Sequence, residues 1–518
     1  MSKKEQFIKE INDGYTFKGR FIVLGGAMLD GACMTNTLVK IPLKTMNRHG
    51  LIAGATGSGK TKTLQILAEH LSQQGVPSLL MDIKGDLSGI AAPSEGHPKI
   101  DERHAQIGIP FEAGASPVEF LSLSSEPGAR LRATVLEFGP VLFSKILGLN
   151  DTQAGIVAVV YKYCDDNKLP LLDLADFKQT LQYITNEGKE DAEKLYGRIS
   201  SASVGTIMRK IIELEQQDAE RFFGERSFDV DDLIRTDKNG RGIVSVLRLT
   251  DIQDRPKLFS TFMLQMLAEI YSNFPEEGDA EKPKLVIFID EAHLVFEEAS
   301  DALMDQIEVI VKLIRSKGVG LFFVTQNPAD IPDDVLGQLG LKIQHALRAF
   351  TAKDRKAIKL AAQNYPISEF YDVAQVVTEL GIGEALVTAL NEKGIPTPLA
   401  HTLLRAPESR MDVLTEREID SIIRKSEIID KYNEEINRES AHEILTKKLE
   451  EAQDETIQKE MRAQRERARS TSSRQEKSAI EKIIGNPTTR QVARTVAREL
   501  TRGLLGVLGI SSTTRRKR

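Results

Sequence analysis

Blocks of apolar residues alternate with polar residues near the N-terminus and predict the start of a parallel sheet. The run "GLIA" (50–53) precedes a glycine-rich loop, and the run "PSLLMD" (77–82) ends in an aspartate. Between them, residues from about Lys60 to Gln74 have the apolar spacing of a helix. A strand, a helix and a second strand in this order predict that the two strands pair in parallel.

Further apolar runs predict strands in the second half of the chain, separated by helices. We expect a long helix at about 256–274 and another at 304–318. The runs that predict strands lie at 242–249, 284–293, 319–326, 342–349 and 384–390, and the last two of these are expected to be the final strands.

The change from strand patterns to helical patterns and back divides the chain into parts. We expect an α/β protein with a mainly parallel sheet, an inserted helical subdomain and a charged helical C-terminal extension. The predicted parts are a short N-terminal β element (1–45), a first part of the core (46–100), a helical insertion (101–238), a second part of the core (239–405) and a charged helical extension with a basic tail (406–518).

The net charge of −6 conceals a basic C-terminal end. Residues 462–518 contain fifteen Lys or Arg and four Asp or Glu, which gives +11, so residues 1–461 carry −17. A basic tail on an acidic body is typical of an arm that binds polyanions. The alternative is a solvated tail that folds against the acidic body of its own chain or of a neighbour.

The composition argues against several classes of protein. The two cysteines, Cys33 and Cys164, are far apart, which argues against a disulfide framework and against a cysteine-based zinc site. No secretory signal opens the chain, and no run of about eighteen apolar residues is present that could span a bilayer. We therefore expect a cytoplasmic protein without a transmembrane segment.

The loop after the first predicted strand has the sequence G-x-x-x-x-G-K-T, which is typical of phosphate binding. Glycines let backbone N–H groups surround a phosphate, and the following helix offers its partial positive charge. Lys60 is expected to reach the β- and γ-phosphates of ATP, and the Thr61 hydroxyl is expected to bind Mg²⁺. The residues that we expect to hold the nucleotide are Gly54, Ala55, Thr56, Gly57, Ser58, Gly59, Lys60, Thr61 and Lys62.

Two later strands end in side chains that suit ATP hydrolysis. The run "LVIFIDEAH" delivers Asp290 and Glu291, of which Asp290 would hold Mg²⁺ and Glu291 would polarise the attacking water. Gln326 ends the next apolar run and would orient that water or report the γ-phosphate. The alternatives are an acidic pair that caps a helix and a glutamine that makes ordinary hydrogen bonds at a strand end.

Two arginines are candidates for a catalytic group that acts on a neighbouring subunit. Arg315 lies just before the strand that is predicted to end at Gln326, and Arg348 lies near the end of the run at 342–349. A guanidinium from a neighbour can neutralise charge in the transition state of phosphoryl transfer. We favour Arg315, then Arg348, and an intrachain salt bridge is the alternative for either.

The motifs together resemble a known family. The sequence resembles the HerA-like branch of the HerA–FtsK ATPases, and most of all its YjgR-type bacterial members. The stretches that carry the resemblance are "MNRHGLIAGATGSGKTKTLQILAE", "DIKGDLSGIA", "FIDEAHLVF", "IRSKGVGLFFVTQNPADIPDDVLGQLG" and "KIQHALRAFTAKDRKAIK". The resemblance implies a RecA-like P-loop core with helices on both faces of the sheet, ATP and Mg²⁺ as cofactors, nucleotide sites between the subunits of a hexameric ring, and translocation of DNA. About fifty residues precede the loop, which is too few for the β-barrel domain of HerA.

A last helix is predicted within 487–518, at about 487–509. Its arginines and its apolar residues each recur every four positions and fall on opposite faces. Such a helix suits an anionic membrane surface, the groove of a partner protein or nucleic-acid phosphates. The alternative is a helix that packs on its own ring.

The leading hypothesis is a Mg²⁺-dependent ATP hydrolase that works as a hexameric ring motor on DNA. The alternative from another class is a nucleotide-gated ring scaffold that recruits a partner or a membrane and hydrolyses ATP slowly. A motor that moves polypeptide is a third possibility.

Overall fold

The computed structural model describes residues 2–450 and Met461, apart from 253–254, 279, 297–300, 350, 435 and 437–438. Residues up to Ile444 form one compact unit, and those from Leu445 onward belong to a second. The predicted helix at 487–509 and the whole basic tail (462–518) lie outside the described residues, so their prediction is untested. The fold below is that of the first unit.

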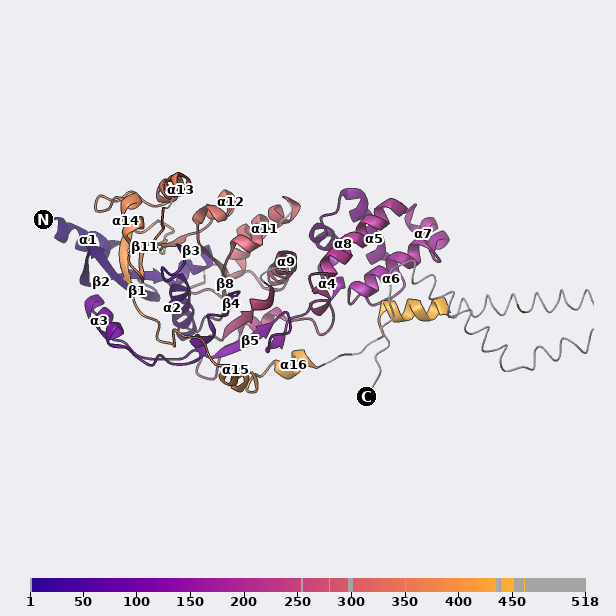
Figure 1. The fold of residues 1–518 in the computed structure, drawn as a ribbon, viewed down its shortest axis with the longest axis horizontal. Helices are drawn as coiled ribbons and strands as arrows, with labels where there is room; N and C mark the ends of the chain where they lie inside the picture. The colour runs from indigo at the N-terminus through magenta and orange to yellow at the C-terminus, as the bar shows by residue number, and fades with distance from the viewer. Residues whose placement is uncertain are drawn as a thin grey trace, which may run out of the picture. The chain divides into compact units, whose positions relative to one another are not determined.

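A single mixed sheet of twelve strands organises the first unit (Figure 1). From one edge to the other, its strands are β2 (Ala32–Pro42), β1 (Phe21–Leu29), β12 (Ala400–Leu404), β11 (Glu384–Thr388), β10 (Leu341–Gln344), β3 (Gly50–Ala53), β9 (Val319–Thr325), β8 (Leu285–Ile289), β4 (Ser78–Asp82), β7 (Val244–Arg248), β5 (Val118–Ser122) and β6 (Ala129–Arg130).

The strands from β10 to β6 are parallel, and those from β2 to β10 pair in antiparallel fashion. The two strands predicted to pair, β3 and β4, do run parallel, but they are not neighbours. Strands β9 and β8 lie between them, because the chain returns much later to fill the gap. The prediction of their direct pairing is therefore wrong, and the prediction of a mainly parallel α/β sheet is confirmed.

The central strands are buried on both faces. Every residue of β3, β4, β8 and β9 is buried, which is the pattern of a parallel sheet covered by helices on each side. In Figure 1, α11 and α12 lie above the sheet and α15 lies below it.

The described residues contain helices of very different length. The α-helices are α1 (Lys3–Gly14), α2 (Lys60–Gln73), α3 (Pro98–Ile107), α4 (Val135–Ile146), α5 (Asp151–Asp166), α6 (Leu174–Thr185), α7 (Lys189–Tyr196), α8 (Ser201–Glu215), α9 (Pro256–Asn273), α10 (His293–Phe296), α11 (Asp301–Ile314), α12 (Asp333–Leu336), α13 (Ala352–Gln363), α14 (Val373–Glu379), α15 (Glu416–Ile423) and α16 (Ile429–Asn433). The 3-10 helices are η1 (Leu43–Arg48), η2 (Ser88–Ala91), η3 (Ala219–Arg221), η4 (Val230–Ile234), η5 (Thr250–Ile252), η6 (Arg315–Lys317) and η7 (Pro328–Asp330).

The helices α4 to α8 follow one another without an intervening strand and form a cluster around aromatic side chains. Phe143 of α4 packs against Phe177 of α6 with ring centroids 5.0 Å apart, and both rings contact Tyr161 of α5. The range expected to be helical, 101–238, also contains β5 and β6, which belong to the sheet. The structure thus corrects that expectation for the residues before α4.

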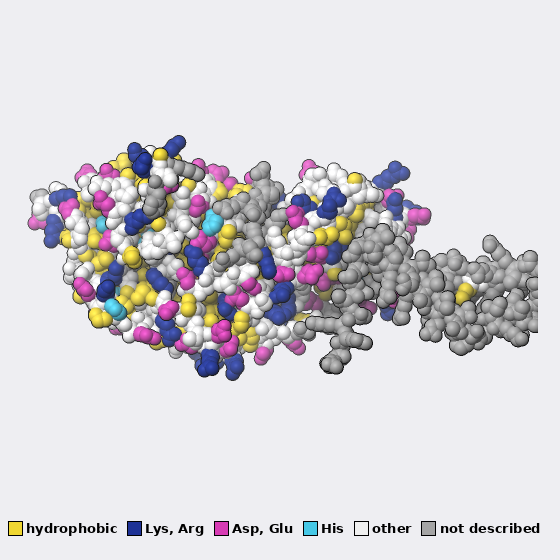
Figure 2. Space-filling view, in the orientation of Figure 1, with side chains coloured by type: hydrophobic (Ala, Val, Ile, Leu, Met, Phe, Trp, Pro, Cys, Tyr) yellow, Lys and Arg dark blue, Asp and Glu magenta, His cyan; other side chains and the backbone are white. Residues whose placement is uncertain are grey.

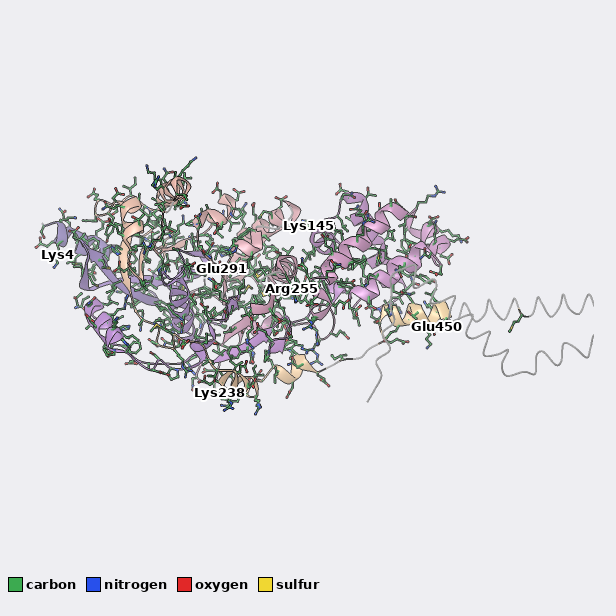
Figure 3. All side chains as sticks on the ribbon, in the orientation of Figure 1. Lys4, Lys145, Lys238, Arg255, Glu291 and Glu450 are labelled. Carbon is green, nitrogen blue, oxygen red and sulfur yellow. The ribbon has the colours of Figure 1, made fainter. Side chains whose placement is uncertain are left out.

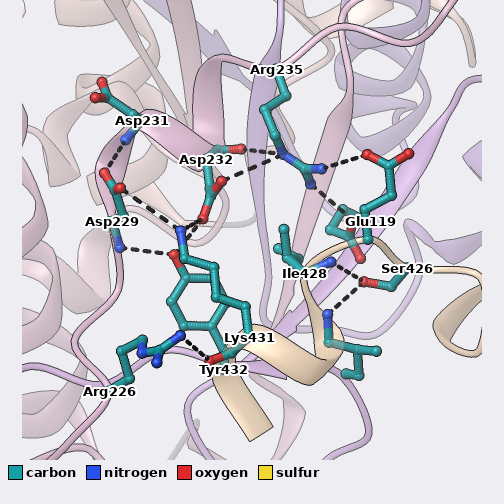
Figure 4. A network of polar contacts seen from close by, with 12 residues as sticks. Glu119, Arg226, Asp229, Asp231, Asp232, Arg235, Ser426, Ile428, Lys431 and Tyr432 are labelled. Carbon is teal, nitrogen blue, oxygen red and sulfur yellow. Dashed lines mark hydrogen bonds and ion pairs between the residues drawn. The ribbon is translucent and has the colours of Figure 1, made fainter. Parts of the chain in front are cut away.

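The segment after β12 was expected to form a charged helical extension, and its described part contains the two short helices α15 and α16 and a further helical stretch at 441–450. Ser426 Oγ accepts hydrogen bonds from the N–H groups of Ile428 and Ile429, which turns the chain between α15 and α16 (Figure 4). The Tyr432 hydroxyl then donates to Asp232 of η4. Tyr432 is fully buried, so this part of the extension is anchored on the core rather than projecting as a long helix.

The surface of the first unit mixes both signs of charge. Figure 2 shows Lys and Arg interspersed with Asp and Glu on the visible face, with small apolar areas between them. Within the described residues, no helix is both long and apolar enough to cross a bilayer.

Candidate nucleotide-binding site

Three adjacent strands deliver the predicted site residues to one edge of the sheet, and a fourth strand beside them ends at the same edge. The glycine loop follows β3, Gln326 follows β9, the acidic pair follows β8, and a short turn follows β4. The strands are parallel, so their carboxyl ends meet at the same edge, where ligands bind in α/β sheets. Figure 3 places Glu291 in this central region.

Hydrogen bonds connect the loops that meet at this edge. Thr56 Oγ1 donates to Gln326 Oε1 (3.3 Å), and Gln326 Nε2 donates to Glu291 Oε2 (3.5 Å). On the other side of the loop, Thr61 Oγ1 donates to Asp86 Oδ2 (3.2 Å). The structure therefore brings the loop, Glu291 and Gln326 together, although they are far apart in the sequence.

The loop has a backbone that only glycine adopts easily. Gly54, Gly57 and Gly59 have φ of +154°, +76° and +113°. A Cβ on Gly57 would meet open space, while a Cβ on Gly54 would lie 2.5 Å from His345 Cβ. The loop thus has an open side at Gly57, where a phosphate can approach, and a packed side at Gly54.

His345 supports the packed side of the loop. Its backbone N–H donates to Ala53 O (2.7 Å), and its Nε2 lies 2.9 Å from Thr63 Oγ1 of α2. Burial, aided by the Lys60 ammonium, lowers the pKa of His345 to about 4, so the imidazole is neutral at pH 7. A neutral ring adds no second positive charge beneath Lys60.

Lys60 points back over the loop. Its Nζ donates to Gly54 O (2.7 Å) and to Ala55 O (3.2 Å). Burial and the Lys84 ammonium lower the pKa of Lys60, while Glu291, Asp290 and Asp86 oppose this shift. The loop carbonyls and these carboxylates thus compensate a largely buried ammonium.

Asp290 and Glu291 differ in their surroundings. Asp290 is 3% exposed, and no described residue donates a hydrogen bond to its buried Oδ2. Burial raises the pKa of Asp290 to about 6, and the nearby Glu291 adds to this effect, while Lys84 opposes it. Burial would raise the pKa of Glu291 too, but an ion pair with Lys84 lowers it below its usual range.

The end of β4 and the turn after it contribute three groups to which the sequence analysis gave no role: Asp82, Lys84 and Asp86. Asp82 accepts hydrogen bonds from the N–H groups of Gly85, Asp86 and Leu87 at 2.7, 3.1 and 3.2 Å. The turn is thereby fixed with Lys84 facing Glu291 and Asp86 facing Thr61. The polar run "DIKGD" at the end of a predicted strand could have indicated these site residues. Assigning them to the site also required the knowledge that β4 lies beside β8.

Arg315 lies in η6, before β9, and thus at the amino edge of the sheet. β9 has seven residues, which at about 3.3 Å each separate Arg315 from Gln326 by about 20 Å. There Arg315 lines a surface cavity of about 360 Å³ with Arg48, Lys312 and two glutamates. The structure does not bring Arg315 to the glycine loop of its own chain.

The remaining two predicted residues make contacts within the chain. Arg348 donates to Thr378 O (2.7 Å) and Leu380 O (3.3 Å) at the end of α14. The Lys62 ammonium donates to Met411 O, which ties α2 to the segment after β12. Their roles toward nucleotide stay predictions.

Comparison with known proteins identifies relatives of the chain. The chain is 24% identical over 370 residues to the DNA double-strand break repair helicase HerA of Sulfolobus acidocaldarius, covering 70% of this chain and 66% of that protein. It is 25% identical over 401 residues to the probable helicase MJECL08 of Methanocaldococcus jannaschii, covering 70% and 67%. The chain thus spans slightly less than two thirds of the HerA relative.

Among solved structures, the fold is similar to that of the bacterial conjugative coupling protein TrwBdeltaN70. The TM-score is 0.50 at 13% identity, with 79% of this chain and 94% of the other covered. This likeness agrees with a RecA-like P-loop core, as the resemblance implied. The sequence profile described as Helicase HerA-like C-terminal matches residues 29–515. The chain therefore belongs to the helicase HerA-like C-terminal family.

Proposed function

We propose that the protein is a Mg²⁺-dependent ATP hydrolase that works as a hexameric ring motor on DNA. One observation carries the hydrolase part: the glycine loop, Asp290, Glu291 and Gln326 converge at the carboxyl edge of the adjacent parallel strands β3, β9 and β8. The convergence supplies groups for binding phosphates, holding a metal and activating water in one place.

The residues at this edge suit ATP and Mg²⁺. The loop presents backbone N–H groups on its open side, and Lys60 supplies a cation for the β- and γ-phosphates. Thr61 and the buried Asp290, whose Oδ2 has no donor among the described residues, offer oxygen ligands for Mg²⁺. Among the described residues, no group of three or more His, Cys, Asp or Glu could hold a metal ion by itself, so Mg²⁺ would share its ligands with the phosphates. When bound, the ion neutralises charge on the transferred phosphoryl group.

Glu291 is the proposed general base. Its carboxylate stays ionised beside Lys84, and its backbone places it directly after β8, next to Gln326. It would accept a proton from the attacking water, while the Gln326 amide orients that water.

The ring and DNA parts of the proposal have separate support. Arg315 lies at the opposite edge of the sheet from the loop, so it can act only on the site of another subunit, as in a ring with sites between subunits. The relatives named as DNA repair helicases support DNA as the substrate. Cytoplasmic location and the role of the basic tail also stay predictions.

Glu291→Gln tests the hydrolase part. The amide keeps the shape of the side chain and loses its basicity, so ATP should still bind while turnover falls by at least about 100-fold. Binding is measured with a fluorescent ATP analogue and turnover by phosphate release. Turnover equal to that of the wild type would remove Glu291 from the role of base.

A further inference from the structure

Both carboxylate oxygens of Glu291 are engaged by other side chains. Oε1 forms an ion pair with the Lys84 ammonium. Oε2 lies 3.3 Å from His293 Nδ1 and accepts a hydrogen bond from Gln326 Nε2 at 3.5 Å. Glu291 Oε1 is also buried. A carboxylate has about four lone-pair sites and must turn one toward water to take its proton. The contacts with His293 and Gln326 lie on Oε2, and the remaining site on Oε1, beside Lys84, is on an atom that solvent does not reach.

The backbone of Glu291 is strained. Its φ is +46°, a left-handed conformation that costs a non-glycine residue stability and persists only when surrounding contacts enforce it. The contacts with Lys84, His293 and Gln326 are those that hold the side chain. If the ion pair with Lys84 is released, Glu291 can leave this strained position.

Lys84 is placed to make and break such a contact. Its backbone belongs to the turn that Asp82 fixes through three N–H groups, so the base of the side chain is anchored. The side chain is 37% exposed, whereas that of Glu291 is 7% exposed. An anchored, flexible and partly exposed ammonium can leave the buried carboxylate without disturbing the sheet.

We infer that Lys84 is a positioning residue that holds Glu291 in a resting position, and that water activation requires Lys84 to release Glu291 Oε1. The ion pair then sets the fraction of sites ready for hydrolysis, because only released sites can react. The inference rests on the proposed function, since it takes Glu291 as the base.

The test compares Lys84→Met, which removes the charge, with Lys84→Arg, which keeps it. We expect kcat of Lys84→Met without DNA to rise about tenfold, which corresponds to about 1.4 kcal/mol, at an unchanged KM for ATP. Lys84→Arg should keep the low rate. Lys162→Met is the matched control, because it removes a lysine from an exposed ion pair with Asp166 on α5, and its rate should equal that of the wild type.

An unchanged or lower kcat of Lys84→Met, with nucleotide binding intact, would overturn the inference. If Lys84→Met does not fold, Lys84→Gln removes the charge with a polar side chain and is judged by the same criterion. The double variant Lys84→Met/Glu291→Gln should lose the added turnover, and its persistence would also overturn the inference. Equal rates of the wild type and Glu291→Gln would instead refute the proposed base, which separates the two failures.

Discussion

Arg315 offers a sharp test of the ring, because the structure fixes where it cannot act. It precedes β9, whose seven residues place it about 20 Å from the edge that carries the glycine loop. An arginine side chain is far shorter than this separation. If Arg315 contributes to hydrolysis, it must therefore do so at the site of a neighbouring subunit.

The perturbation is Arg315→Ala, alone and mixed with Lys60→Met. Loss of an arginine that stabilises the transition state lowers kcat by about 10³-fold or more, and Lys60→Met should be inactive too. In a ring assembled from equal amounts of both, a site works when its loop comes from the Arg315→Ala chain and its arginine from the Lys60→Met chain. Random mixing makes about one quarter of the sites competent by this trans arrangement.

The assay is phosphate release by the mixture after the chains have been allowed to exchange. A mixture of Lys60→Met with Glu291→Gln is the control, because both changes lie at the same site and no neighbour can repair them. Wild-type turnover of Arg315→Ala, or no recovery in its mixture with Lys60→Met, would refute the reasoning. If turnover recovers when Arg348→Ala, rather than Arg315→Ala, is mixed with Lys60→Met, Arg348 is the arginine that acts on the neighbouring site.

Two further predictions concern packing, one in the glycine loop and one at the buried histidine that precedes β3. Gly57→Ala should lower the free energy of unfolding by about 1–2 kcal/mol, because of its left-handed backbone alone. Gly54→Ala should lower it by about 1–3 kcal/mol more, because the added Cβ would lie 2.5 Å from His345 Cβ. Equal shifts of the urea midpoint for the two variants would contradict this prediction. Burial lowers the pKa of His49 to about 4, although a hydrogen bond with Val311 O opposes the shift. A neutral His49 stabilises the fold above pH 6.5, and this contribution is lost as the pH falls toward 4, so the cost of His49→Asn should be about 2 kcal/mol smaller at pH 5 than at pH 7.5. A cost that does not change with pH, measured by urea unfolding at both values, would argue against a neutral buried ring.

The sequence predicted the central strands because their signal is local. β3, β4, β8 and β9 are continuous apolar runs that end in glycine or polar residues, and the structure buries them on both faces. Their order in the sheet is not local, so β3 and β4 were expected to be neighbours. Only packing of the whole chain decides that β9 and β8 lie between them.

β5 shows why other elements were missed. Its five residues include Glu119, which breaks the apolar run. Arg235 compensates the buried Glu119 carboxylate at 3.0 Å from a position 116 residues later (Figure 4). A charged residue in a buried strand is stable only with such a partner, and a distant partner leaves no sign in the local pattern.

The residues of the candidate site also fall into those predicted from a local motif and those that depend on the order of the strands. The glycine loop, Asp290 and Glu291 were predicted, because motif and flanking strand lie together in the sequence. Lys84 and Asp86 were not assigned roles, because their contacts with Glu291 and Thr61 depend on the adjacency of β4 and β8 and on the loop after β3.

The most direct test of the central claim is the steady-state ATPase rate of the full chain with and without double-stranded and single-stranded DNA, with its mass in solution recorded. We predict a hexamer whose Mg²⁺-dependent rate rises strongly with DNA and is abolished in Glu291→Gln. A particle that hydrolyses ATP slowly at the same rate with and without either DNA would contradict the motor and favour a nucleotide-gated scaffold.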